Sequence, residues 1–139
     1  MSKISYNADL LKIMSLFENI TRCNLKDCFV DGNNLLTFIV KENEIGKAIG
    51  KKAVNVRKIE SLLNKKIRIV EFSNEARQFV RNLTQPLMVE DVSLDGETVM
   101  IKASDTRTKG LLIGRDSQNL KNIESITQKY FPIKNIKVI

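Results

Sequence analysis

The stretch EIGKAIGKKAVNVRKIESLL, from Glu44 to Leu63, has two glycines four residues apart, then two lysines, then an amphipathic run. The apolar spacing from Val56 onward predicts a helix that follows the second glycine. A glycine lets the backbone approach a phosphate closely, and the amides at the start of a helix attract an anion. The stretch therefore predicts a phosphate-binding loop.

The spacing of this loop argues against a bound mononucleotide or dinucleotide. The Walker A motif requires G-x-x-x-x-G-K-[ST], in which the final hydroxyl binds a magnesium ion. The segment from Gly46 to Lys52 is one residue short between its glycines, and Lys52 stands where the hydroxyl is required. The G-x-G-x-x-G fingerprint is absent, and the chain has no histidine to serve as a general base. No catalytic residue, metal ligand or cofactor is expected.

An internal repeat gives the organisation of the chain. Residues 48–63 recur 64 positions later, at 112–127, with the same Ile, Gly, Asn, Ile, Glu and Ser. The flanking segments repeat too, so that each copy reads helix, strand, strand, short helix, glycine loop, helix, strand. The sequence therefore predicts an α+β fold with two tandem domains, residues 1–72 and 73–139.

Local patterns place the elements of each copy. Apolar residues on one helical face predict leading helices at 8–20 and 74–83, the second with Ser73 or Asn74 as its N-cap. Apolar or alternating runs of strand length predict the strands. These are expected at 27–32, 35–40 and 67–72 in the first copy and at 86–96, 97–103 and 135–139 in the second.

Basic side chains are concentrated in the two segments that contain the glycine loops. Residues 41–68 carry nine basic and three acidic side chains, and residues 107–139 carry seven and two. The segment between them, 69–106, carries three basic and seven acidic side chains, and the whole chain has a net charge of +7. This distribution favours polyanionic partners at two sites, with nucleic acid ahead of a membrane surface.

The remaining composition points to an intracellular protein. Cys23 and Cys28, with no further cysteine or histidine, cannot form a four-ligand zinc site, so buried free thiols are expected, with a disulfide as the lesser alternative. No apolar run approaches the ~20 residues of a membrane span, and the start of the chain lacks a signal-peptide core. A cytoplasmic location is therefore expected, and the oligomeric state stays open.

An I-G-x-x-G loop between two short helices, within a strand–helix–helix–strand unit, resembles the KH domain, and the chain contains it twice. The extra helix and strand before each unit resemble the prokaryotic, or type II, arrangement. The wider chain is similar to the archaeal NusA-related transcription factors in the segments LFENIT, DCFVDG, KAIGKKAVNVRKIE, KKIRIVEFS and IGRDSQNLKNIE. That family consists of two tandem KH domains. The resemblance implies binding of single-stranded RNA in transcription termination, antitermination or elongation.

The resemblance also implies which residues contact RNA, since a KH loop clamps the backbone of about four nucleotides. Aliphatic side chains are expected to contact the bases, because six Phe, two Tyr and no Trp are too few for stacking platforms. Asn55 and Asn119, matched between the copies, contact either RNA or the loop backbone. The candidate RNA-binding residues are Lys47, Ile49, Gly50, Lys51, Lys52, Ala53, Asn55, Val56 and Arg57 in the first copy, and Ile113, Gly114, Arg115, Asp116, Ser117, Asn119 and Lys121 in the second.

Three loop residues depart from the family pattern. The fourth loop position, usually glycine, is Ala53 in the first copy and Ser117 in the second. If this position requires a positive φ, both residues are strained. If it is the first residue of the helix, alanine is harmless and serine is a good cap, and the small size of both residues favours this alternative. The negative charge of Asp116 repels a phosphate, so the second copy is expected to bind RNA more weakly than the first.

Two classes of function remain open from the sequence. The preferred one is an RNA-binding factor of transcription, with RNA polymerase or the transcription complex as a further partner. The alternative is a protein-interaction scaffold on RNA polymerase or the ribosome, whose altered loops bind RNA weakly or not at all. The two basic segments favour the first class, and the three departures in the loops favour the second. Whether single-stranded DNA also binds is left open.

Overall fold

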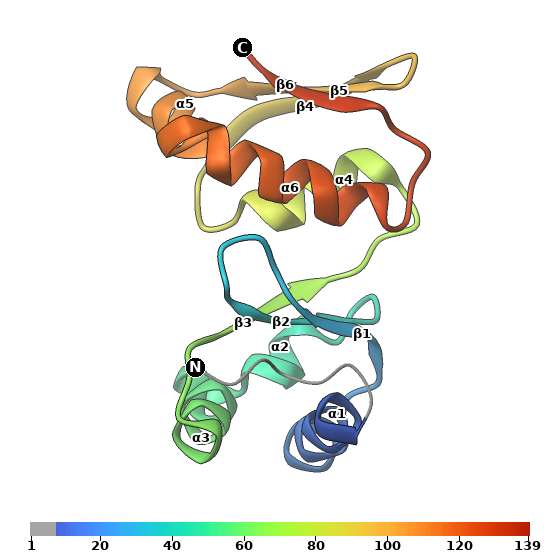
Figure 1. Cartoon of the computed structure of the whole chain (residues 1–139), viewed down its shortest axis with the longest axis vertical. Coiled ribbons are helices and arrows are strands. Elements are labelled where there is room, and N and C mark those ends of the chain that lie inside the picture. The colour runs from blue at the N-terminus through green and yellow to red at the C-terminus, as the bar shows by residue number, and fades with distance from the viewer. Residues whose placement is uncertain (1–7) are drawn as a thin grey trace. The chain divides into compact units, whose positions relative to one another are not determined.

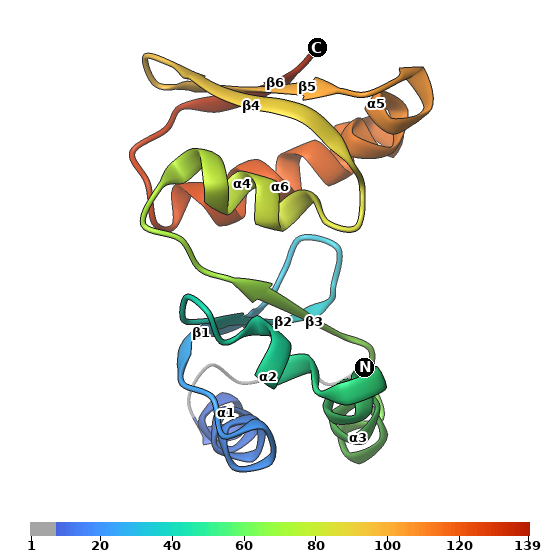
Figure 2. The ribbon, with the colours of Figure 1, turned by 180° about the vertical axis from the view of Figure 1, so that it is seen from behind.

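The computed structural model describes residues 8–139, and the chain divides into two compact units, residues 1–72 and 73–139 (Figures 1 and 2). The first seven residues of the predicted first domain lie outside the described residues. Each unit holds one three-stranded sheet, with its long helices on one face (Figure 1). The predicted α+β class and the predicted order of elements are confirmed in both units.

The first unit is built around a mixed sheet in the order β1-β2-β3. Strands β1 and β2 are antiparallel, whereas β2 and β3 are parallel, with Phe38 of β2 opposite Cys28 and Ile69. The helices α2 and α3 form the crossover that a parallel pair requires. The elements are α1 (Ala8–Thr21), β1 (Leu25–Val30), β2 (Leu36–Val40), α2 (Ile45–Ile49), a short 3₁₀ turn (Lys51–Ala53), α3 (Val54–Leu63) and β3 (Ile67–Glu71).

The second unit repeats this topology with the sheet order β4-β5-β6. Strand β5 pairs antiparallel with β4 and parallel with β6, which places Val99 opposite Leu94 and Ile136. The elements are α4 (Ala76–Thr84), β4 (Val89–Asp95), β5 (Thr98–Ala103), α5 (Thr106–Ile113), a short 3₁₀ turn (Arg115–Ser117), α6 (Gln118–Gln128) and β6 (Asn135–Val138).

Apolar side chains from the helices and from one face of the sheet form the core of the first unit. Phe17 of α1 stacks on Phe38 of β2 with ring centroids 4.3 Å apart, and both side chains are fully buried. The predicted apolar face of α1 is confirmed, since Leu10 is buried and Ile13 and Ile20 pack against the same cluster. Burying aromatic rings of this size is a large part of what stabilises a unit of about 70 residues.

Cys23 and Cys28 both lie in this core as free thiols, as expected. Burial, together with the smaller effect of the nearby Asp27 carboxylate, raises the pKa of the Cys28 thiol to about 12. A buried thiol with such a pKa stays protonated at neutral pH and behaves as a small apolar side chain.

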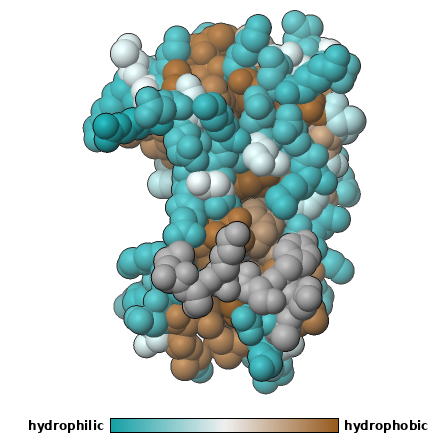
Figure 3. All heavy atoms as spheres, in the orientation of Figure 1, coloured by the Kyte–Doolittle hydropathy of each residue, from teal (hydrophilic) through white to brown (hydrophobic). Residues whose placement is uncertain are grey.

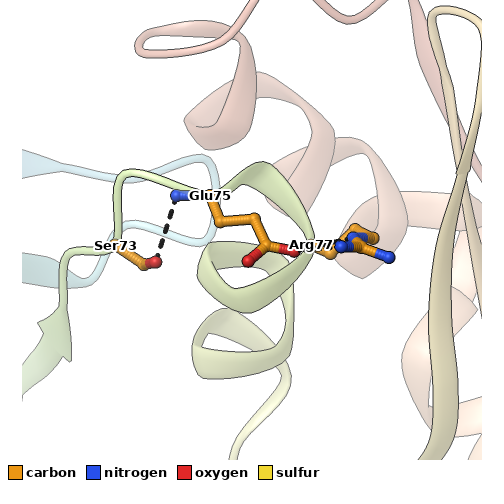
Figure 4. A network of polar contacts seen from close by, with 3 residues as sticks. All are labelled: Ser73, Glu75 and Arg77. Carbon is orange, nitrogen blue, oxygen red and sulfur yellow. Dashed lines mark hydrogen bonds and ion pairs between the residues drawn. The ribbon is translucent and has the colours of Figure 1, made fainter.

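The start of α4 differs from the prediction. The helix begins at Ala76 with Glu75 as its N-cap, and no side chain caps it, so the assignment of Ser73 or Asn74 as the cap is wrong. The Ser73 hydroxyl instead accepts a hydrogen bond from the Glu75 N–H at 3.1 Å (Figure 4). A serine hydroxyl bonded to the amide two residues later stabilises a turn, and this turn precedes the helix.

The surface of the first unit keeps some apolar side chains on its helices. Leu11 of α1 and Leu62 of α3 are mostly exposed, and Figure 3 shows hydrophobic surface around these two helices. The second unit shows both hydrophilic and hydrophobic surface in the same view. Between residues 8 and 139, each helix is too short or too polar to cross a lipid bilayer.

Candidate nucleic-acid interface

The two glycine loops have nearly the same backbone. Gly50 ends α2 with φ 80° and ψ 167°, and Gly114 ends α5 with φ 74° and ψ 175°. The N–H of Gly50 donates to the carbonyl of Gly46 at 3.0 Å, and the N–H of Gly114 donates to the carbonyl of Gly110 at 2.9 Å. The repeat found in the sequence is therefore a repeat of conformation.

The second glycine of each loop is required by geometry, whereas the first is not. A Cβ added at Gly50 would lie 2.9 Å from the Asn55 side-chain nitrogen, and Gly50 also has the positive φ that disfavours other residues. A Cβ added at Gly46 would meet no atom within 4 Å. The first glycine therefore leaves open space beside the loop.

In each copy, the second glycine is followed by one basic residue and then by two consecutive residues with left-handed backbone. They are Lys52 (φ 54°) and Ala53 (φ 59°) in the first loop, and Asp116 (φ 55°) and Ser117 (φ 59°) in the second. Helix α3 begins at Val54 and helix α6 at Gln118, each directly after its left-handed pair. A left-handed conformation costs a side-chain-bearing residue roughly 1–2 kcal/mol.

The expectation that Ala53 and Ser117 are the first helical residues is therefore wrong. Both take the positive φ that the family's glycine accommodates without strain. The Ser117 side chain also makes no capping hydrogen bond to the helix it precedes. The physical reason is that the short connection between the two helices takes left-handed backbone at these positions whichever side chain is present.

The matched asparagines join the two helices of each loop. The side-chain amide of Asn55 donates to the Lys47 carbonyl at 3.1 Å, and that of Asn119 donates to the Leu111 carbonyl at 2.9 Å. In both cases the acceptor lies eight residues earlier, in the last turn of the preceding helix, where carbonyls lack a helical partner. Of the two alternatives for these asparagines, the structure places the amide on the backbone of the loop region.

The Arg57 guanidinium donates a hydrogen bond to the carbonyl of Lys52, within the left-handed segment of the first loop. Lys121 occupies the corresponding position in the second unit. Arg57 therefore supports the loop that presents Lys51 and Lys52. A guanidinium has five N–H donors, so this bond leaves others available to a phosphate.

The cationic side chains predicted to contact RNA all lie on the surface. Lys47, Lys51 and Lys52 are exposed in the first unit, as are Arg115 and Lys121 in the second. The aliphatic candidates Ile49, Val56 and Ile113 are half-buried, so each presents part of its side chain beside a loop.

The two loops differ in their charge. The first presents two lysines at the positions where the second presents Arg115 and Asp116, and Asp116 is itself exposed. An anion beside the first loop therefore meets only positive side chains at these two positions. Beside the second loop it meets one charge of each sign.

Another matched pair has a structural role that the sequence did not reveal. The carboxylate of Glu60 accepts a hydrogen bond from the Ile67 N–H at 3.0 Å, and that of Glu124 accepts one from the Ile136 N–H at 2.8 Å. Each glutamate thus joins the helix after the loop to the last strand of its unit. Their identity in the repeat was the only signal for this role.

Comparison with known proteins agrees with this architecture. A family model described as KH domain matches residues 13–99. The solved structure titled "Crystal structure of APE1850" superposes with a TM-score of 0.72 at 30% sequence identity, covering 93% of this chain and 96% of that one.

Several archaeal proteins are similar over nearly the whole chain. The probable transcription termination protein NusA of Methanococcus vannielii is 32% identical, with 99% of this chain and 80% of that protein covered. The protein of the same name from Methanocaldococcus jannaschii is 30% identical over 100% of this chain and 77% of its own length. The one from Halococcus morrhuae is 28% identical over 98% and 99%. KH proteins of this kind are a non-enzymatic family. The chain belongs to the KH domain family, among the archaeal NusA-like proteins.

Proposed function

We propose that this protein binds single-stranded RNA through its two glycine loops and acts in transcription termination, antitermination or elongation. The observation that carries the proposal is the repeated loop. In both units a positive-φ glycine and two left-handed residues precede a helix of at least ten residues, beside exposed cationic side chains. The relatives named as transcription termination proteins support the cellular role.

The phosphates of the strand are the proposed partners of the loop backbone. The first amide of α3 and that of α6 are already used, since the Val54 N–H donates to the Lys51 carbonyl and the Gln118 N–H donates to the Arg115 carbonyl. The positive end of each helix dipole still favours an anion beside the loop. Lys51 and Lys52 add two positive charges at the first of these positions. Lys47 lies on the preceding helix. The open space beside Gly46 lets the RNA backbone approach this helix closely.

The bases are proposed to contact the aliphatic side chains beside each loop. Ile49 and Val56 flank the first loop, and Ile113 flanks the second, each half-buried. Such contacts bury apolar surface without fixing a hydrogen-bond pattern, so the strand would be held with little sequence preference. Each loop would hold about four nucleotides.

The two units are proposed to contribute unequally. Asp116 places a negative charge where the first loop has Lys52, and Lys121 replaces the arginine that supports the first loop. The first unit therefore supplies most of the affinity. RNA polymerase or another part of the transcription complex is the proposed protein partner, and the cytoplasm the proposed location.

Two charge-reversal variants test this proposal in a binding assay with a short labelled single-stranded RNA. Lys51→Asp/Lys52→Asp should abolish most of the binding, because it reverses two charges next to the α3 amides. Arg115→Asp should also weaken binding, but by a factor several times smaller than the factor for Lys51→Asp/Lys52→Asp. Lys12→Asp, at an exposed position on α1, changes the net charge by as much as Arg115→Asp and should have little effect. Unmodified protein that fails to bind RNA at low salt would exclude RNA binding and favour the protein-interaction scaffold.

A further inference from the structure

We propose that the first unit holds an additional nucleotide of the bound strand in a hollow at the far end of α3 from the glycine loop. This inference rests on the proposed RNA binding and extends it to a second contact region. The hollow has a volume of about 250 Å³ and lies between the β1–β2 turn and the segment that joins α3 to β3. Its walls include Val30, Asn34, Leu35, Asn64, Lys65 and Lys66.

The backbone around the hollow is fixed by its own hydrogen bonds. The Asp31 carboxylate accepts from the N–H groups of Asn33 and Leu35, at 2.8 and 3.0 Å, which closes the β1–β2 turn. Asn34 in that turn has φ 62°, and Asn64 after α3 has φ 52°, so both are left-handed. The Asn64 N–H donates to the Glu60 carbonyl and ends the helix. Two asparagines therefore line the hollow from turns that are held by their own hydrogen bonds.

The side chains around the hollow match the chemistry of a nucleotide. Lys65 and Lys66 supply two positive charges for a phosphate. Carboxamides such as those of Asn34 and Asn64 combine a donor and an acceptor and can pair with the edge of a base. Val30, a residue that is 40% exposed, adds an apolar surface against which a base can pack. Drug-sized ligands occupy pockets of roughly 300–1,000 Å³, so a hollow of this volume suits a smaller group.

The position of the hollow fits a strand that extends beyond the loop. Helix α3 has ten residues, so Lys52 before it and Lys65 after it are separated by about 15 Å along the helix axis. A strand whose backbone is held at the glycine loop by about four nucleotides can reach this distance. The proposed strand would therefore run along α3 from the glycine loop to the hollow.

The second unit differs in length at both segments that correspond to the walls of the hollow. Two residues, 96 and 97, join β4 to β5, where five, 31–35, join β1 to β2. Six residues, 129–134, join α6 to β6, where three, 64–66, join α3 to β3. The proposed subsite therefore belongs to the first unit alone.

Lysines after a helix also favour the helix dipole, which gives Lys65 and Lys66 a purely structural explanation. That explanation predicts a change in stability and no effect that depends on RNA length. The test therefore compares a tetranucleotide, which the glycine loop can hold alone, with a hexanucleotide, which can reach the hollow. All measurements use the full chain and fluorescence anisotropy.

Two variants address the lysines and the asparagines separately. Lys66→Glu removes a phosphate contact, with Lys12→Glu on exposed α1 as the matched charge control. Asn34→Gly/Asn64→Gly removes both carboxamides, and glycine accommodates the left-handed backbone at both sites without strain. Circular dichroism confirms that each variant is folded.

The proposal predicts an effect confined to the longer RNA. Lys66→Glu should weaken hexanucleotide binding about fivefold and reduce its log–log salt slope by about 0.7, the value for one phosphate contact to a single strand. The asparagine variant should weaken hexanucleotide binding by a similar factor with an unchanged salt slope. Tetranucleotide binding should change less than twofold in both.

Two other outcomes would overturn the inference in distinguishable ways. Equal losses for Lys66→Glu and Lys12→Glu, or equal effects on both RNA lengths, would show a general effect of charge while RNA binding itself stands. Failure of the unmodified protein to bind either RNA would reject the proposed function together with the subsite. In addition, the side-chain amide NMR signals of Asn34 and Asn64 should shift with the hexanucleotide and stay in place with the tetranucleotide.

Discussion

Replacing Ala53 with glycine should stabilise the first unit. Ala53 has φ 59° and ψ 30°, a conformation that costs a residue with a side chain roughly 1–2 kcal/mol. Glycine removes this cost but gives the unfolded chain more freedom, which offsets about 0.5–1 kcal/mol. The free energy of unfolding should therefore rise by about 0.5–1 kcal/mol. Most glycine substitutions within helical segments would have the opposite sign.

A matched control makes the sign of this effect informative. Ser61 lies exposed within α3, and Ser61→Gly should destabilise the same unit by about 0.5 kcal/mol through the low helix propensity of glycine. Thermal unfolding followed by circular dichroism should resolve the difference, because 1 kcal/mol shifts Tm by about 4–8 °C in a unit of this size. If Ala53→Gly lowers Tm as Ser61→Gly does, the left-handed conformation inferred for the loop is wrong.

Three further predictions concern the same loops and the second unit. Gly50→Ala should destabilise the first unit by at least about 2 kcal/mol, because it adds a Cβ at positive φ next to Asn55. Gly46→Ala should instead stabilise α2 by about 0.5–1 kcal/mol. Urea denaturation measures both changes. Asn55→Ala should remove about 1 kcal/mol of stability and weaken RNA binding with an unchanged salt slope, which separates a loop-positioning role from a phosphate contact. The Thr108 N–H donates to the Asp105 carboxylate at 2.7 Å and lowers the pKa of Asp105. The stabilising effect of this hydrogen bond should therefore be present at neutral pH and lost as the pH falls through that lowered pKa. Comparing the Tm of the unmodified chain with that of Asp105→Ala across pH 2–7 tests this, and a constant difference would contradict it.

The order of elements could be predicted because the sequence contains the fold twice. The apolar periodicities that predicted α1 and β2 reflect side chains that are buried in the core, such as Phe17 and Phe38. Burial of this kind constrains residue type strongly, and an independent second copy supports each assignment. The two glycine loops could be located for the same reason, because the geometry at Gly50 and Gly114 requires glycine.

The details of the loops could not be predicted, because they depend on contacts between residues apart in sequence. Nothing in the identity of Ala53 distinguishes a left-handed residue from the first residue of a helix. The side-chain amide of Asn55 donates to a carbonyl eight residues earlier in the sequence. The two groups come within 3.1 Å of each other only when both helices are folded. The cap of α4 was misplaced because Ser73 bonds to the amide of Glu75 in the preceding turn.

The salt dependence of RNA binding tests the central claim most directly. For a single strand, the slope of log K against log salt is about −0.7 for each phosphate neutralised, so a loop that contacts about four phosphates should give a slope near −3. With a tetranucleotide, which one loop can hold, we predict this slope for the unmodified protein and a value closer to zero for Lys51→Asp/Lys52→Asp. A protein whose affinity for RNA does not depend on salt, or whose slope is the same in that variant, would contradict phosphate binding at the first glycine loop.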